Sequence, residues 1–282
     1  MPTPRVAAIH DMSGFGRCSL TVAIPVLSAM GVQCCPLPTA YLSTHTGGFT
    51  GYTFLDMTDE MPKTAMHWAE LGIHFNAVYT GFMGSEAQMD IVADFVRTFR
   101  RDDTTVFVCD PVMGDHGKIY KTYTPAMCAG MTRLAEMADV IVPNFTEAAV
   151  LLGEDYSFHA LAQDEAGCRS IVERLSRNGE RSVVLTGVSL RKGEIGVCLY
   201  DRAGGGAEFL FDEFVGKEFH GTGDVFASVL TGALVQGKPL REAVRLAEAF
   251  VRECAKQTMP QKLPAREGVD FEPVLWKLHD GL

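Results

Sequence analysis

The stretch Gly221-Thr222-Gly223-Asp224 combines the two kinds of group needed to transfer a phosphoryl group to a hydroxyl group. Glycines let the backbone approach a ligand closely, and free amides at the start of the helix expected here bind anions. A carboxylate beside them can take the proton of the attacking hydroxyl. We interpret Asp224 as a catalytic base beside an anion site; the alternative is that it only caps the helix. No lysine follows the second glycine, so this is not a Walker loop.

Further carboxylates lie in loops that follow two expected strands. Residues 110–115 read Asp-Pro-Val-Met-Gly-Asp, and residues 143–147 read Pro-Asn-Phe-Thr-Glu. Carboxylate oxygens at the ends of strands can hold Mg²⁺ directly or through water, which makes Asp110 and Glu147 candidates for a metal site. Both stretches are also ordinary turn and helix-cap sequences, and capping and metal binding are compatible.

The loop after the first expected strand reads Asp-Met-Ser-Gly-Phe-Gly over residues 11–16. It superficially resembles a dinucleotide-binding fingerprint, but the G-x-G-x-x-G spacing fails because the third glycine is missing. This argues against a Rossmann dehydrogenase.

A scaffold of short apolar strands alternating with amphipathic helices must position these loops. We expect strands at residues 6–10, 32–37, 77–80, 104–109, 140–142, 182–185, 195–200 and 208–214. We expect helices at residues 18–30, 62–71, 85–100, 125–137, 146–152, 164–177, 223–235 and 240–256. This alternation predicts one α/β domain over residues 1–282, with a mostly parallel sheet, helices on both faces and a late antiparallel hairpin. Ligands bind such sheets at the carboxyl ends of the strands, where the loops above fall.

Composition and charge exclude several classes of protein. With 47% hydrophobic residues the chain can bury a core, so it is not a disordered protein. A net charge of −10 argues against binding nucleic acid or an anionic membrane. The apolar run 6–9 is too short for a signal peptide and no run is long enough for a membrane helix, which predicts a cytoplasmic protein. The 8 cysteines lack zinc-site spacing and are interpreted as small core residues of a reducing compartment.

Several of these stretches together resemble the ribokinase superfamily of small-molecule kinases. The Gly-Thr-Gly-Asp box at 221–224 is similar to the signature of that superfamily. Its vitamin B6 branch (pyridoxal, pyridoxine and pyridoxamine kinases) is indicated by Ala-Tyr-Leu-Ser-Thr-His-Thr-Gly at 40–47, Thr-Gly-Phe-Met-Gly-Ser at 80–85, and residues 109–115 and 142–147. The resemblance extends from about residue 5 to about residue 255.

The resemblance implies a ribokinase-like fold of three layers (α/β/α) and a kinase activity. The enzyme would transfer a phosphoryl group from ATP, its co-substrate, to the 5′-hydroxymethyl group of a B6 vitamer in the salvage of pyridoxal 5′-phosphate. It would use Mg²⁺, with or without a monovalent cation, and form a homodimer. Nucleic acid and membrane are not expected as partners.

The resemblance also implies roles for residues in catalysis and in ATP binding. Asp224 would be the catalytic base, and Asp110 and Glu147 would help to position Mg²⁺. The anion hole and the contacts to the ATP phosphates would come from Gly221, Thr222, Gly223, Asn144, Asp115 and Thr186.

A second set of residues would bind the ring of the substrate. Asp11 and Thr46 would face its polar atoms, while Leu42 and Phe82 would supply apolar walls. B6 kinases commonly carry serine at the position of Asp11, an aromatic residue at that of Leu42 and tyrosine at that of Phe82. These differences leave the exact ring substrate open.

Two other functions therefore stay open beside the B6 kinase. Hydroxymethylpyrimidine kinases of the superfamily carry aspartate at the position of Asp11, so the chain could be a hydroxymethylpyrimidine (phosphate) kinase of thiamine synthesis, alone or as a second activity. Asp224 argues against this, because that branch often has cysteine in its place. The last alternative is a non-catalytic nucleotide or B6 sensor on the same fold, against which the intact Asp224 also speaks.

Overall fold

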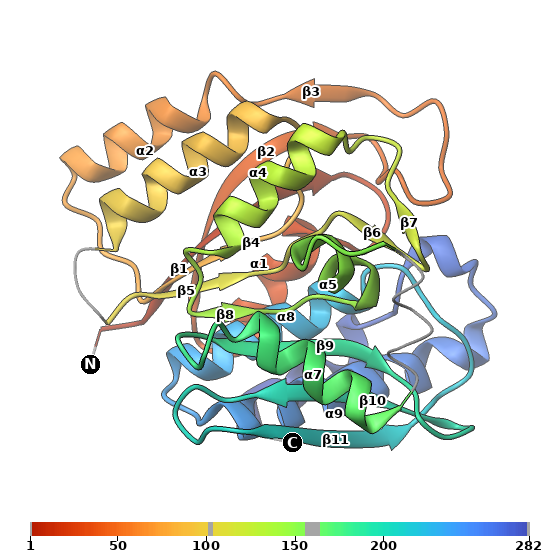
Figure 1. Cartoon of the computed structure of the whole chain (residues 1–282). Helices are drawn as coiled ribbons and strands as arrows, with labels where there is room; N and C mark the ends of the chain where they lie inside the picture. The colour runs from red at the N-terminus through yellow and green to blue at the C-terminus, as the bar shows by residue number, and fades with distance from the viewer. Residues whose placement is uncertain (1, 101–103, 156–163, 281–282) are drawn as a thin grey trace. The chain divides into compact units, whose positions relative to one another are not determined.

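The computed structural model describes residues 2–100, 104–155 and 164–280, which fall into two compact units (Figure 1). The first unit contains the chain up to Val106 and from Val215 onward, and the second contains Phe107–Phe214. The expectation of a single domain over residues 1–282 stays a prediction.

The first unit is built on four strands in the spatial order β4-β1-β2-β3. They are β1 (Arg5–Ser13), β2 (Gln33–Leu42), β3 (Phe54–Asp56) and β4 (Ala77–Thr80). Strand β1 pairs in parallel with both β2 and β4, whereas β3 is antiparallel to β2. The apolar residues 6–9 of β1 are completely buried, as expected for a strand covered on both faces.

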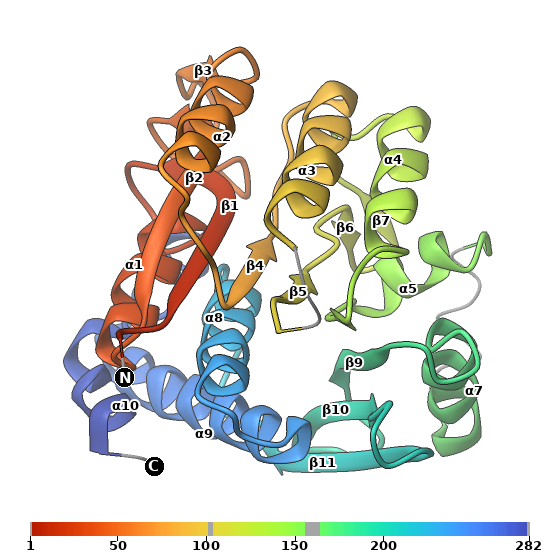
Figure 2. The ribbon, with the colours of Figure 1, turned by 90° about the vertical axis from the view of Figure 1, so that its left-hand side faces the viewer.

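Helices cover both faces of these strands (Figures 1 and 2). One face carries α1 (Leu20–Ala29), α8 (Thr222–Val235) and α9 (Leu240–Thr258), and the other carries α2 (Met61–Glu70) and α3 (Glu86–Phe99). Ser85 caps α3 by accepting a hydrogen bond from the Gln88 amide. After α9 the chain continues through the short helices η1 (Met259–Gln261), η2 (Ala265–Glu267), η3 (Glu272–Val274) and α10 (Trp276–Asp280).

The second unit holds the strands in the order β11-β10-β9-β8-β5. They are β5 (Val106–Cys109), β8 (Val140–Ile141), β9 (Ser182–Val188), β10 (Glu194–Tyr200) and β11 (Ala207–Glu213). Strand β8 is parallel to β5 and β9, and β10 is antiparallel to β9 and β11. The helices of this unit are α4 (Pro125–Ala135), α5 (Phe145–Leu151) and α7 (Glu165–Leu175), and a separate small hairpin joins β6 (Gly114–Asp115) to β7 (Lys118–Ile119).

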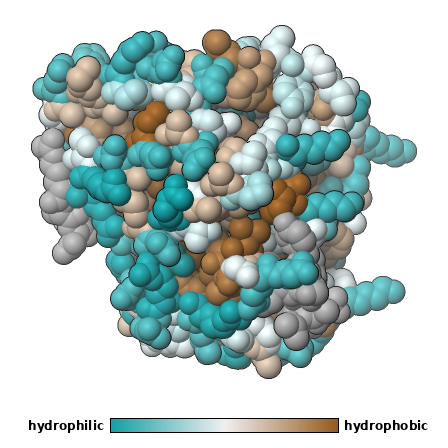
Figure 3. All heavy atoms as spheres, turned by 45° about the horizontal axis from the view of Figure 1, so that its top comes forward, coloured by the Kyte–Doolittle hydropathy of each residue, from teal (hydrophilic) through white to brown (hydrophobic). Residues whose placement is uncertain are grey.

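The α/β class, the mostly parallel sheet and the late antiparallel hairpin are confirmed. The sequence predicts neither β3 nor the β6–β7 hairpin, because strands of two or three residues show no periodicity. None of the described helices is long and apolar enough to cross a membrane. The face drawn in Figure 3 shows hydrophilic side chains together with patches of hydrophobic ones. No disulfide joins the cysteines, all of which lie in the described part of the chain.

Candidate active site

The start of α8 has the geometry expected of an anion site. Gly221 lies just before the helix with φ 75° and ψ 0°, a left-handed conformation that favours glycine. A Cβ atom at this position would lie 1.8 Å from the carbonyl oxygen of Arg17, so a side chain does not fit. Around Gly223, by contrast, a Cβ would meet nothing within 4 Å. The first amides of a helix have no partner within it, and with open space beside Gly223 they can bind an anion.

Asp224 lies in the first turn of α8, next to these amides. Its side chain keeps part of its surface accessible, but burial of the carboxylate raises its pKa to about 7. A hydrogen bond from the Ser19 backbone lowers this pKa, and the charge of Asp11 raises it. A carboxyl group with a pKa near neutrality that a ligand can still reach is suited to accept a proton.

Asp11, at the end of β1, is almost completely buried and bound by hydroxyl groups of its own loop. The Ser13 hydroxyl donates to Oδ2 at 2.7 Å, and the Ser19 hydroxyl donates to Oδ1 at 2.6 Å. Burial raises the pKa of Asp11, and these two bonds partly offset that effect. Ser19 has a positive φ of 51°, a strained conformation for a residue with a side chain. Its contacts with Asp11 and Asp224 compensate for that strain.

Cys18 lies in the same loop, directly before Ser19, which binds both Asp11 and Asp224. Only 8% of its surface is exposed. Burial and the negative charges of Asp11 and Asp224 together raise the pKa of this thiol well above its usual range. The thiol therefore stays protonated and does not act as a nucleophile here.

The other ring-binding candidates of the first unit lie around the ends of β2 and β4. Leu42 ends β2 and is 1% exposed, whereas Thr46 and Phe82 are half-buried. Between them in sequence, His45 is held at both ring nitrogens: Nδ1 accepts from the Gly47 amide at 3.1 Å, and Nε2 donates to the Arg266 carbonyl at 2.6 Å. This pairing makes His45 part of the scaffold of the loop.

Glu147 and Asp110 lie together in the second unit. Glu147 forms a capping box with Asn144 at the start of α5, in which Oε2 accepts from the Asn144 amide at 2.9 Å. Its Oε1 accepts from the amide of Met113 at 3.2 Å, so it also fixes the loop after β5. Burial and the neighbouring charge of Asp110 raise the pKa of Glu147 well above its usual range. The helix-cap interpretation is confirmed for Glu147, and it brings the two carboxylates close together.

The candidate phosphate residues of the second unit lie around the same loops. The Asn144 side chain donates to the Gly114 carbonyl at 2.8 Å, so α5 is tied to the β6–β7 hairpin that carries Asp115. The Thr186 amide donates to the Pro143 carbonyl at 2.9 Å, which places Thr186 beside this loop. The apolar run predicts that the strand ends before Thr186. Strand β9 instead continues to Val188, so Thr186 lies within the strand.

The carboxylates of the second unit fit Mg²⁺ in one of its two common binding modes. Among the residues that the structure describes, no three His, Cys, Asp or Glu side chains converge into a protein-only metal cage. Mg²⁺ more often takes one or two carboxylates, several waters and substrate phosphates. Asp110 and Glu147 fit this mode, because a cation would relieve the repulsion between two neighbouring carboxylates.

Several residues that build the site carry no recognisable signal in the sequence. Ser13 and Ser19 bind Asp11, and Arg17 packs its carbonyl against Gly221. Serine and arginine are common in loops, so only the fold reveals these contacts. The positive φ of Ser19 also could not be foreseen, because serine rarely adopts it.

Comparison with known proteins identifies the family of the chain. A family model described as phosphomethylpyrimidine kinase matches residues 22–267. A candidate phosphomethylpyrimidine kinase of Bacteroides thetaiotaomicron, solved with pyridoxal, shares 40% identity with a TM-score of 0.91, over 98% of this chain and 96% of that chain. The pyridoxal kinase of Lactobacillus plantarum shares 30% identity with a TM-score of 0.88, over 99% and 97% of the two chains.

The relatives of this chain include kinases of two substrate classes. A thiamine biosynthesis bifunctional protein of Geobacter sulfurreducens is 27% identical over 92% of this chain. The match covers 51% of that protein, so the chain spans about half the length of this relative. Pyridoxal kinases and hydroxymethylpyrimidine/phosphomethylpyrimidine kinases both occur among the other relatives.

Proposed function

Because the chain belongs to the phosphomethylpyrimidine kinase family, we propose that it transfers the γ-phosphoryl group of ATP to the 5′-hydroxymethyl group of pyridoxal, pyridoxamine or pyridoxine. The observation that carries this proposal is Asp224, a recessed carboxyl group with a pKa of about 7 beside the open amides of α8. The amides of α8 would serve either a B6 kinase or a pyrimidine kinase, whereas a carboxyl group at position 224 favours the B6 kinase. The likeness to a protein solved with pyridoxal, at 40% identity, favours the B6 vitamers.

Asp224 acts as the general base in this proposal. It accepts the proton of the 5′-hydroxyl group as that oxygen attacks the γ-phosphorus. A base works best when its pKa lies near the working pH, because it is then ionised and still holds the proton well. The burial that raises the pKa of Asp224 to about 7 therefore serves the reaction.

The loop of Gly221, Thr222 and Gly223 stabilises the charge of the transferring group. Amides at a helix start carry a partial positive charge, and oriented amides need no rearrangement as negative charge develops. The missing side chains at the two glycines let the phosphoryl oxygens come close to these amides.

Asp110 and Glu147 would help to position Mg²⁺ for the nucleotide, directly or through water. Glu147 is held in place for this role by the backbone hydrogen bonds that both of its oxygens accept. When bound, Mg²⁺ neutralises charge on the ATP phosphates. Asn144, Asp115 and Thr186 contact those phosphates.

Asp11 and Thr46 read the polar atoms of the ring, and Leu42 and Phe82 pack against it. An ionised Asp11 is an acceptor only, so it needs a donor from the ligand, such as a protonated ring nitrogen. The exocyclic amine of hydroxymethylpyrimidine offers such a donor as well. This favours hydroxymethylpyrimidine phosphorylation as the second candidate function.

A steady-state comparison of four acceptors tests the proposal. With ATP and Mg²⁺, kcat/KM is measured for pyridoxal, pyridoxamine, pyridoxine and hydroxymethylpyrimidine, with Asp224→Asn as the control for base catalysis. We expect a B6 vitamer to have the highest kcat/KM. A higher value for hydroxymethylpyrimidine would assign the chain to thiamine synthesis, and no phosphorylation of any acceptor would favour the sensor. Light scattering tests the homodimer that the resemblance implies.

A further inference from the structure

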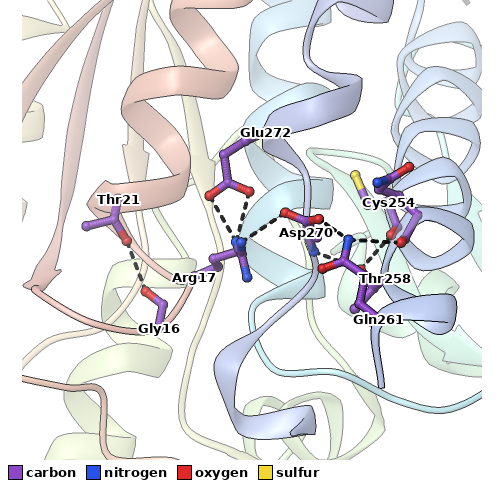
Figure 4. Close-up of polar contacts among 9 residues, drawn as sticks. Gly16, Arg17, Thr21, Cys254, Thr258, Gln261, Asp270 and Glu272 are labelled. Carbon is purple, nitrogen blue, oxygen red and sulfur yellow. Dashed lines mark hydrogen bonds and ion pairs between the residues drawn. The ribbon is translucent and has the colours of Figure 1, made fainter. Parts of the chain in front are cut away.

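Arg17 joins the loop after β1 to a segment near the other end of the chain (Figure 4). Its Nε atom lies 2.9 Å from both carboxylate oxygens of Glu272, and Nη2 lies 2.9 Å from Oδ1 of Asp270. Its backbone amide also donates to the Glu267 carbonyl at 3.2 Å. The side chain of Arg17 is 26% exposed and that of Asp270 is 11% exposed, so water screens this ion pair less than a surface pair.

The segment that Arg17 contacts, residues 265–272, is itself attached to α9. We call this segment the C-terminal brace. The Asp270 amide donates to the Thr258 hydroxyl at 2.7 Å, and that hydroxyl donates to the Cys254 carbonyl at 2.7 Å (Figure 4). The Gln261 side chain donates to the Asp270 carboxylate. Because α9 is a helix of 19 residues, the brace has a rigid support at this end.

The C-terminal brace also contacts two other loops of the candidate site. The carbonyl of Arg266 accepts from His45, in the loop that carries Thr46. The carbonyl of Ala265 accepts from the His220 amide at 3.1 Å, directly before Gly221. Three loops that are far apart in the sequence thus share one support.

The backbone of Arg17 lies against two glycines. A Cβ at Gly221 would lie 1.8 Å from the Arg17 carbonyl oxygen, and a Cβ at Gly268 in the brace would lie 2.8 Å from the Arg17 Cβ. Gly268 has a φ of 85°, in the region that favours glycine. The backbone of Arg17 therefore packs closely against the turn that begins α8 and against the brace.

We propose that Arg17 is a positioning residue, which through the C-terminal brace sets the place of Gly221 and of the amides that follow it. The proposal rests on the proposed function, because those amides matter only if they bind the transferring group. In this role Arg17 acts through the brace and not on the substrate. An error of about 1 Å in the position of a catalytic group can lower the rate roughly 100-fold, so loosening the brace should lower kcat.

The test compares Arg17→Met with Lys277→Met. Lys277 lies in the same unit, pairs with Glu253 and has the same exposed fraction of 26%, and its hydrogen bond and ion pair within the described part of the chain go to α9 and not to a site loop. We expect Arg17→Met to lower kcat roughly 10- to 100-fold with KM for both substrates changed less than about threefold. Lys277→Met should leave kcat within about twofold of wild type. Arg17→Lys, which lacks the fork that reaches both carboxylates, should fall between.

A second readout does not depend on kinase activity. Hydrogen exchange of the amides at residues 45–48 and 220–224 should become faster in Arg17→Met and remain unchanged in Lys277→Met. If Arg17→Met does not fold, Glu272→Gln replaces it, because Glu272 is half exposed and its loss leaves the Asp270 bond intact. Equal exchange and equal kcat in the two methionine variants would overturn the proposal. If the wild type phosphorylates no acceptor, the proposed function fails, and the exchange data alone decide whether the brace holds these loops.

Discussion

The raised pKa of Asp224 predicts a pH dependence that an ordinary aspartate would not produce. With a pKa of about 7, the carboxyl group is about 9% ionised at pH 6 and about 91% ionised at pH 8. Only the ionised form accepts a proton, so kcat/KM for the acceptor is expected to rise about tenfold over this range. An aspartate with the usual pKa of 3.8 is fully ionised throughout, and the profile would be flat.

The assay is kcat/KM for pyridoxal at saturating ATP and Mg²⁺ from pH 5 to pH 9. Asp224→Asn keeps the shape of the side chain and should lower kcat by about 10²–10⁴-fold with little change in nucleotide affinity. Asp11→Asn is the control for assigning the acidic limb, because the charge of Asp11 helps to raise the pKa of Asp224. The limb should move to lower pH in this variant, whereas a limb that belongs to the nucleotide would stay.

The raised pKa of Asp224 should also make the free energy of unfolding depend on pH. Because the native pKa of about 7 exceeds the unfolded value of 3.8, the native state binds more protons between these values, and stability falls as the pH rises through this window. Asp224→Asn should therefore raise the free energy of unfolding by about 1–2 kcal/mol at pH 8, and less at pH 5. The figure is below the full shift because part of the side chain contacts water. A flat rate profile, or more than about a tenth of wild-type kcat in Asp224→Asn, would refute the assignment.

Three further sets of variants test the residues proposed to position Mg²⁺, the residue proposed to bind the ring, and the turn at Gly221. Asp110→Ala or Glu147→Ala should raise the Mg²⁺ concentration that gives half-maximal rate, and titration curves like that of wild type would reduce both residues to turn and cap. Asp11→Ala should lower kcat/KM for every ring substrate by a factor that corresponds to roughly 1.5–3 kcal/mol. Asp11→Ser should restore phosphorylation of pyridoxal but not of hydroxymethylpyrimidine. Equal recovery of both would show that this residue does not select the ring. Gly221→Ala should destabilise the fold by more than about 1 kcal/mol in urea unfolding compared with Gly72→Ala, which shares a positive φ but meets no neighbour.

The sequence predicts the scaffold well where side chains repeat with the period of a helix or a strand. The continuous apolar runs at residues 6–9 and 183–185 predict buried strands, and both lie in strands of the structure, β1 and β9. The chain after residue 258 shows no such period, since it consists of short helices held by tertiary contacts. Its support for the site could not be predicted, because Arg17 and Glu272 are 255 residues apart in sequence.

Individual residues of the candidate site were predictable to different degrees. Asp224 follows a glycine pair and precedes an apolar helix, a local pattern with a direct chemical meaning. Glu147 is ambiguous from sequence, because a capping box and a metal group use the same residue in the same place. The raised pKa of Asp224 needs knowledge of what buries it and of the nearby Asp11, and both depend on the folded chain.

The burial of Cys18 has a consequence for chemical modification of the protein. Thiol-directed electrophiles and peroxides react with the thiolate, and the surroundings of Cys18 suppress that form. Although this sulfur lies in the loop that binds the two site carboxylates, it should react slowly with iodoacetamide, and its oxidation should not limit the lifetime of the protein. A covalent inhibitor would therefore have to be anchored at another residue.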